Sequence, residues 1–123
     1  MVGALTWVGI VLFGALGAVA RFRLDGAVSA RFASDFPFGI LAVNRSGAFA
    51  LGMLNGAAAP HRVLSVLGTG FMGGYTTFST WMIETERLGE DGELGAAFAN
   101  IAVSMVAGLA AAAAGFYLAG AIA

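Results

Sequence analysis

Apolar residues fill four long stretches of the chain, and polar or charged residues gather between them. The stretches cover about residues 4–20, 38–59, 63–84 and 94–122. The first contains about the 17 apolar residues that set the lower limit for a helix crossing the hydrocarbon core of a bilayer. The pattern therefore predicts an all-α membrane protein with four transmembrane helices in a single domain, residues 1–123.

The segments around these stretches leave one alternative open. Residues 18–20, Ala-Val-Ala, resemble the cleavage site of a signal peptide, but no positive segment precedes the first stretch and three more follow. Between Arg21 and Pro37, charged and apolar residues alternate, which predicts a short amphipathic helix at the membrane interface. We expect Pro37 to open the second helix and residues 84–93 to form the last loop.

The middle of the third stretch is a poor helix sequence. It reads Gly73-Gly74-Tyr75-Thr76-Thr77-Phe78-Ser79-Thr80, paired glycines followed by β-branched threonines. A helix interrupted at bilayer depth is tolerated only where its freed backbone groups face protein, water or an ion. We therefore expect a broken third helix with clustered hydroxyl donors. The alternative is a kinked helix whose hydroxyls bond back to carbonyls of their own helix.

Polar residues inside apolar helices mark an ion pathway or a contact between helices. Asn44 could donate hydrogen bonds to an anion or join two helices. Arg45 could extend toward the interface, pair with Glu84, or lie at a shallower depth than the second stretch suggests. Glu84 itself could equally be an interfacial charge. Phe78 and Trp81, three residues apart, should share a helix face, where a positive ring edge could contact a small anion.

Composition narrows the function. The chain is 59% hydrophobic and 11% charged, with a net charge of −1 and no lysine, so a nucleic-acid-binding surface is not expected. With no cysteine and a single histidine, His61, a zinc site is not expected either. No nucleophile elbow or phosphate-binding glycine loop is present, so we do not expect an enzyme. Nineteen glycines beside many alanines predict closely packed membrane helices.

The arginines give a weak orientation signal. If both termini lie on one side of the membrane, Arg21, Arg23, Arg31 and Arg87 lie on the other side and Arg62 lies with the termini. Two of these four, Arg21 and Arg87, are beside helix ends, where they could serve packing instead. Without them, two arginines on one side of the membrane stand against one arginine on the other. So small a bias is compatible with insertion in both orientations, and such a protein would form an antiparallel homodimer.

Three strings carry a family resemblance over nearly the whole chain: residues 14–21 (GALGAVAR), 44–47 (NRSG) and 70–80 (GFMGGYTTFST). With them the chain resembles the small bacterial fluoride channel family, the fluoride exporters of the camphor-resistance type. The resemblance implies an antiparallel dual-topology dimer in the bacterial inner membrane, with two fluoride pores. It also implies a central structural Na⁺ held by the backbone carbonyls of Gly73 and Thr76. A heterodimer stays open beside the favoured homodimer, since some members pair unequal subunits.

The resemblance also assigns residues to the fluoride path and its surroundings. Trp81 departs from the family, which usually has phenylalanine there, and its indole N–H adds a donor. Arg45 is unusual after the asparagine, and relatives often carry further hydroxyl or phenol groups where Asn100 and Gly108 flank Ser104. The implied path consists of Asn44, Phe78, Trp81, Ser79, Thr80 and Ser104, with Arg21 and Glu84 as structural or vestibule residues.

A fluoride pore is physically reasonable for this residue set. An ion smaller than a carboxylate pays a Born penalty of at least about 20 kcal/mol on entering an ideal low-dielectric medium, so hydroxyls, an amide and ring edges must replace its water. We expect passive export, without ATP or obligatory proton coupling. Two rivals remain. A small multidrug-type, proton-coupled exporter needs a carboxylate in its first helix, which is absent here, and a non-transporting membrane subunit packing through Gly52–Gly56 leaves the broken helix unexplained.

Overall fold

The computed structural model describes residues 3–32 and 36–122, with the backbone alone described at Ser79, and all regular secondary structure within these residues is helical. The elements are α1 (Ala4–Arg31), α2 (Phe38–Gly56), α3 (His61–Val63), η1 (Leu64–Met72), α4 (Gly73–Tyr75), α5 (Ser79–Glu90) and α6 (Leu94–Ile122). From α3 to α4 the chain is helical without interruption, and the middle portion, η1, has the wider turns of a π-helix. We call α3 through α5 the third segment.

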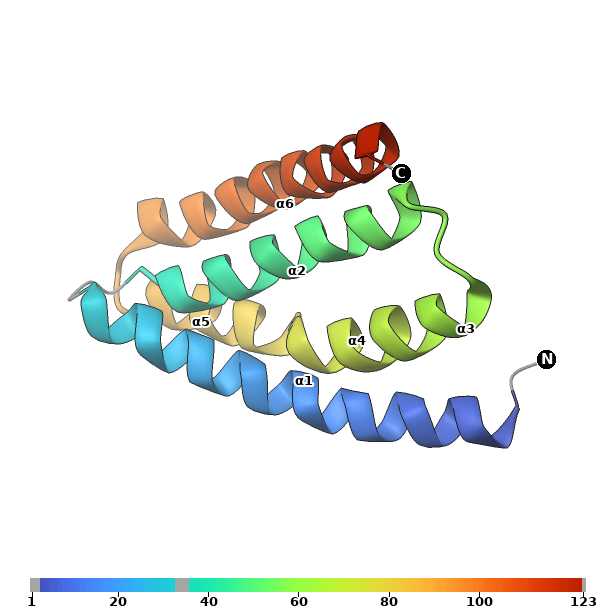
Figure 1. Ribbon diagram of the computed structural model, residues 1–123. Coiled ribbons are helices and arrows are strands. Elements are labelled where there is room, and N and C mark those ends of the chain that lie inside the picture. Colours follow the sequence, from blue (N-terminus) through green and yellow to red (C-terminus); the bar gives the residue numbers. More distant parts are fainter. Residues whose placement is uncertain (1–2, 33–35, 123) are drawn as a thin grey trace.

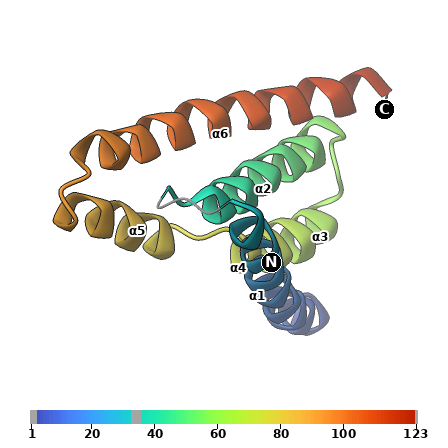
Figure 2. The ribbon, with the colours of Figure 1, turned by 90° about the vertical axis from the view of Figure 1, so that its left-hand side faces the viewer.

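The helices run side by side, with both ends of the chain at the same end of the molecule as the turn between α2 and α3 (Figure 1). α6 packs along α2, while α1 packs along η1 and α4. Figure 2 views α1 nearly along its axis and shows α5 reaching away from α4 toward the start of α6. The third segment therefore contacts α1 with its first half and α6 with its second half.

The first helix is longer than the apolar stretch that begins it. α1 continues through Arg21 to Arg31, so the expectation of a separate interfacial helix after residue 20 is wrong. Charged residues do not end a helix when their side chains reach solvent, and Arg23 and Arg31 are exposed. The amphipathic residues are thus the last turns of α1.

The loop expected over residues 84–93 is also wrong. α5 continues to Glu90, because Leu88 is buried at 3% exposure while the acidic side chains around it face outward. The turn that remains is short and closes with a hydrogen bond of 2.9 Å from the Glu93 N–H to the Leu88 carbonyl. Gly92 has φ 81°, a left-handed conformation that glycine adopts without strain.

Glycines bring the helices into backbone contact. A Cβ atom added at Gly17 of α1 would meet the Phe71 carbonyl of η1, and one added at Gly52 of α2 would meet the Ala112 carbonyl of α6. Such close approach is how helices associate where lipid provides no hydrophobic drive between them. Gly52 and Gly56, the small-residue face noted in the sequence, therefore pack against α6 of the same chain.

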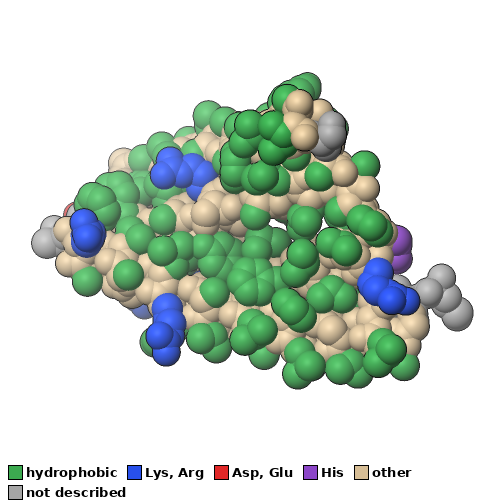
Figure 3. All heavy atoms as spheres, in the orientation of Figure 1, with side chains coloured by type: hydrophobic (Ala, Val, Ile, Leu, Met, Phe, Trp, Pro, Cys, Tyr) green, Lys and Arg blue, Asp and Glu red, His purple; other side chains and the backbone are tan. Residues whose placement is uncertain are grey.

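Much of the apolar surface remains outside this small core. Phe22, Val106 and Leu109 are between 69% and 80% exposed, and Figure 3 shows hydrophobic side chains spread across one whole face with few charges among them. Among the described helices, α1 and α6 are long and apolar enough to cross a membrane by length and composition. The fold is thus all-helical with an apolar exterior, as expected of a membrane protein. Two further spans, at residues 38–59 and 63–84, remain predictions.

Adding one methyl group at Gly17 should test the packing of α1 on the third segment. Gly17→Ala should lower the free energy of unfolding in detergent by about 1–3 kcal/mol, because the new Cβ overlaps the Phe71 carbonyl. Gly26→Ala is the matched control on α1, since nothing lies within 4 Å of a Cβ there. Thermal unfolding followed by circular dichroism measures both, and equal melting temperatures would contradict this packing.

Candidate functional site

The third segment loses its helical backbone at Thr76 and regains it at Ser79. Thr76 is extended, with φ −80° and ψ 156°, and Phe78 returns to helical angles before α5 begins. We call residues 76–78 the extended linker. Two helix ends, the carboxyl end of α4 and the amino end of α5, therefore meet at this linker, and each leaves backbone groups without their usual helical partners.

Asn44 of α2 holds the centre of the extended linker. Its Nδ2 donates to the Thr77 carbonyl at 2.8 Å, and its Oδ1 accepts from the Thr77 N–H at 2.9 Å. The side chain thus replaces both backbone partners of one residue, as a neighbouring strand does in a sheet. Of the two roles considered for Asn44, the contact between helices is the one seen in this chain. One Nδ2 hydrogen stays unused by this pair of bonds.

Two backbone carbonyls lack their helical donors because the corresponding N–H groups bond elsewhere. In a continuous helix the Gly73 carbonyl would accept from the Thr77 N–H, which here bonds to Asn44. The Thr76 carbonyl would accept from the Thr80 N–H, which here donates to Thr77 Oγ1 at 3.2 Å. Thr77 therefore caps the amino end of α5 from the position before its N-cap residue, Phe78. Gly73 and Thr76 are the two residues that the sequence resemblance assigns to sodium.

The hydroxyl groups of Thr76 and of the preceding Tyr75 have different partners. Thr76 Oγ1 donates to the Met72 carbonyl at 2.8 Å, so for this one residue the expected alternative of bonding back to its own helix is what occurs. Tyr75 is buried, and its hydroxyl lies 2.8 Å from Ser46 Oγ of α2. This second polar contact joins α2 to the end of α4, next to the Asn44 contact.

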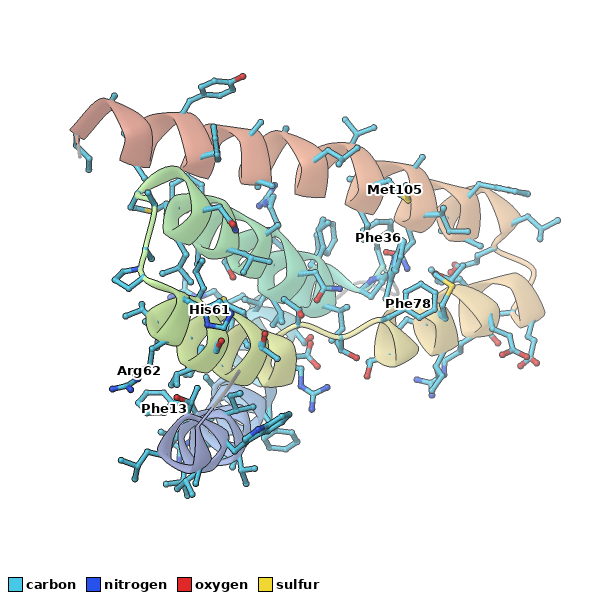
Figure 4. The ribbon with its side chains drawn as sticks, turned by 90° about the vertical axis from the view of Figure 1, so that its right-hand side faces the viewer. Phe13, Phe36, His61, Arg62, Phe78 and Met105 are labelled. Atoms are coloured by element: carbon cyan, nitrogen blue, oxygen red, sulfur yellow. The ribbon has the colours of Figure 1, made fainter. Side chains whose placement is uncertain are left out.

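An open groove of about 400 Å³ runs beside the extended linker. Phe78 is 69% exposed and its ring meets Trp81 edge-on, with centroids 5.6 Å apart and an interplanar angle of 81°. Figure 4 shows Phe78 beside the start of α5, away from His61 and Arg62, which lie at the beginning of the third segment. Gly73 is exposed, with nothing within 4 Å of a Cβ. The groove is lined by Asn44, Gly47, Ala48, Leu51, Gly68, Met72, Gly73, Thr76, Thr77, Phe78 and Trp81.

Asn100 of α6 is a polar residue to which the sequence analysis gave no role. It is 1% exposed, its carbonyl accepts from Trp81 Nε1 at 3.3 Å, and its Nδ2 donates to Thr85 Oγ1 at 2.8 Å. Ser104, a predicted path residue, donates to Asn100 Oδ1 at 3.5 Å. The signal in the sequence that could have indicated a role for Asn100 is its side-chain amide within the alanine-rich stretch of α6.

The remaining predicted residues whose side chains are described lie outside the groove lining. Arg21 and Glu84 are half-buried, as is Thr80, and the Ser79 side chain lies outside the described part of the structure. Arg45 is exposed and forms no ion pair with any described residue, Glu84 included; it borders a separate groove beside Ser46 and Phe49. Within residues 3–32 and 36–122, no group of three histidine, aspartate or glutamate side chains could hold a metal ion.

Comparison with known proteins gives matches over most of the chain. A family model described as CrcB-like protein, Camphor Resistance (CrcB), matches residues 8–116. A protein of Mycobacterium tuberculosis named fluoride-specific ion channel FluC 2 is 53% identical over 113 residues, covering 92% of this chain and 90% of the relative. A protein of the same name from Mycolicibacterium paratuberculosis is 56% identical over 106 residues, covering 86% and 87%. A Geobacter protein named fluoride-specific ion channel FluC is 48% identical over 103 residues, covering 80% and 83%.

Replacing Asn44 by aspartate should loosen the extended linker. The carboxylate can still accept from the Thr77 N–H, but it cannot donate to the Thr77 carbonyl, so two oxygens face each other. Amide hydrogen exchange at Thr77 should speed up by roughly tenfold, the effect of losing one hydrogen bond worth about 1 kcal/mol together with some repulsion. Mass spectrometry of the peptide containing residues 72–81 measures this exchange.

Asn55→Asp is the control for this exchange experiment. Asn55 is exposed, and its Nδ2 donates to the Leu51 carbonyl of its own helix at 2.9 Å, away from the linker. Unchanged exchange in Asn44→Asp, or an equal increase in Asn55→Asp, would show that Asn44 does not hold the linker.

Proposed function

The chain belongs to the CrcB-like, camphor-resistance family, and we propose that it is a fluoride-selective channel through which F⁻ leaves the cytoplasm passively. The observation that carries this proposal is the groove in which Asn44, the extended linker, Phe78 and Trp81 lie together. The relatives named fluoride-specific ion channels match this chain over the residues that build that groove. The protein is thus a channel rather than an enzyme.

The groove provides the interactions that a small anion needs. Dehydrating fluoride is costly, so donors and positive edges must replace water one by one. Asn44 has one Nδ2 hydrogen beyond its bond to Thr77, and the edge of an aromatic ring carries positive charge. We assign the fluoride path to Asn44, Phe78, Trp81, Ser79, Thr80 and Ser104, with Arg21 and Glu84 near its ends.

We propose that the complete pore forms only when two copies associate. Phe78 at 69% exposure and Gly73 with open space around it both lie on the surface of a single chain, next to the groove. A second copy would cover them. The near-balanced arginines fit insertion in both orientations, hence an antiparallel dimer of four-span subunits in the bacterial inner membrane. We favour a homodimer, and a heterodimer is the alternative.

The carbonyls of Gly73 and Thr76 fit the proposed central sodium ion. Both belong to residues of the groove lining, and neither receives the N–H that a regular helix would supply, because those N–H groups bond Asn44 and Thr77 Oγ1. Uncharged carbonyl oxygens are ligands that suit a hard monovalent cation. When bound, sodium supplies a fixed positive charge beside the pore without a titratable group.

Two observations disfavour the rival functions. A multidrug-type exporter needs a membrane-embedded acid in its first helix, and α1 has no acidic residue before Asp25. A non-transporting subunit would use the Gly52–Gly56 face to bind a partner, yet both of these glycines pack against α6 of the same chain.

Fluoride release from liposomes tests the proposed function directly. Purified protein in vesicles loaded with potassium fluoride should release fluoride once valinomycin carries potassium out, because passive conduction needs only a gradient and charge balance. A fluoride electrode measures the rate. Vesicles loaded with chloride or a cationic dye should retain their contents. If folded, dimeric protein releases fluoride only at the background rate, the channel assignment is wrong.

The Phe78→Ile variant tests whether fluoride release depends on the aromatic ring of Phe78 or only on its apolar bulk. Isoleucine keeps apolar bulk but removes the positive ring edge, so fluoride release should slow at least about fivefold, as expected for losing roughly 1 kcal/mol. Phe98→Ile is the control, because Phe98 is equally exposed, at 71%, but lies on α6 outside the groove lining. Equal rates in the two variants would contradict the role of Phe78.

Sodium should stabilise the folded protein specifically. A ligand that binds only the native state adds about 1.4 kcal/mol for each tenfold rise in its concentration above the dissociation constant. Melting temperature in detergent should therefore increase with sodium chloride and stay lower in N-methyl-glucamine chloride of equal ionic strength. The same melting temperature in both salts at every concentration would remove sodium from the proposal.

A further inference from the structure

We propose that Asn100 is a positioning residue that fixes the orientation of Trp81, so that this aromatic side chain presents its ring rather than its indole N–H to the groove. The contacts of Trp81 and Asn100 carry this inference. Its consequence for ion flow rests on the proposed channel function.

Three hydrogen bonds close a cycle between α5 and α6. Trp81 Nε1 donates to the Asn100 carbonyl at 3.3 Å, and Asn100 Nδ2 donates to Thr85 Oγ1 at 2.8 Å. Thr85 Oγ1 in turn donates to the Trp81 carbonyl at 2.9 Å. The ring of Trp81 is therefore bonded directly to Asn100 of α6, and its backbone carbonyl is linked to Asn100 through Thr85.

The donors and acceptors of this cycle match without conflict. Thr85 has one hydroxyl hydrogen, which goes to the Trp81 carbonyl, so its oxygen is free to accept from Asn100. Asn100 Oδ1 accepts from Ser104. At 1% exposure, an asparagine with lost partners would leave buried polar groups unsatisfied, which costs about 1–3 kcal/mol. In this arrangement both polar side-chain atoms of Asn100 have a partner.

The cycle determines what Trp81 offers to an anion. The one N–H group of its side chain bonds to the Asn100 carbonyl, so the indole is not a donor in the groove. What remains facing the groove is the ring, held edge-on against Phe78 with an interplanar angle of 81°. A tryptophan held in this way can take the place of the family's usual phenylalanine without adding a polar group to the path.

Fluorescence and fluoride release together test this role. Trp81 is the only tryptophan in a Trp7→Phe background, because the chain has 2 tryptophans. In that background, Asn100→Leu and Thr85→Val each remove the side-chain bond between Asn100 and Thr85, while the Asn100 backbone carbonyl stays as the acceptor of the indole N–H. Because that bond keeps Asn100 against α5, each variant should lower the fluorescence anisotropy of Trp81 and slow fluoride release roughly three- to tenfold, the effect of one lost hydrogen bond. Thr85→Ser keeps the hydroxyl and should restore both values. Asn55→Leu should change neither.

A second background separates positioning from general stability. In a Trp81→Phe protein the cycle has no indole to hold, so Asn100→Leu and Thr85→Val should alter fluoride release less than about twofold. If both variants slow release equally in that background, or leave Trp81 anisotropy unchanged, the positioning role is wrong. If the Trp7→Phe parent releases no fluoride while the anisotropy changes occur as expected, the channel assignment fails and the hold of Asn100 on Trp81 is supported.

Discussion

The backbone of Thr77 must be hydrogen-bonded although it lies in no helix, and the rest of the site depends on this requirement. An apolar environment makes an unpaired amide group expensive, so an interruption within a buried helical segment needs a partner from elsewhere in the chain. Asn44 is that partner, since its amide presents one donor and one acceptor at the spacing of a peptide group. Because the Thr77 N–H bonds to Asn44 and the Thr80 N–H bonds to Thr77 Oγ1, the carbonyls of Gly73 and Thr76 lack the donors that a regular helix would supply.

The helices around the linker keep this arrangement rigid by close backbone packing rather than by a large core. Val43 of α2 and Asn100 of α6 are the largest fully buried side chains among the described residues. Glycine contacts on α1 and α2 bring the flanking helices close, and the outward faces of α1 and α6 remain apolar. This distribution is the reverse of that in a water-soluble protein, where the largest apolar side chains gather inside.

Sequence reasoning reached the helical class, and it marked the stretch around Thr76 as poor helix sequence because glycine pairs and threonines are poor helix formers in any context. It misjudged helix ends at Arg31 and Glu90, since long charged side chains at a surface do not stop a helix. It could not foresee the π-helical turns of η1, which arise from packing rather than from a residue signal. The partner of Trp81 was equally hidden, because the acceptor is a backbone carbonyl, and every residue has one.

Both ends of the chain emerge at the same end of the helix bundle (Figure 1), and this limits how two copies could be joined genetically. A short peptide linking the last residue of one copy to the first of the next would force the copies to point the same way. Head-to-tail fusion into an oppositely oriented pair therefore demands an additional crossing element between the copies. The protein encoded by such a tandem gene would have to cross the membrane an odd number of times.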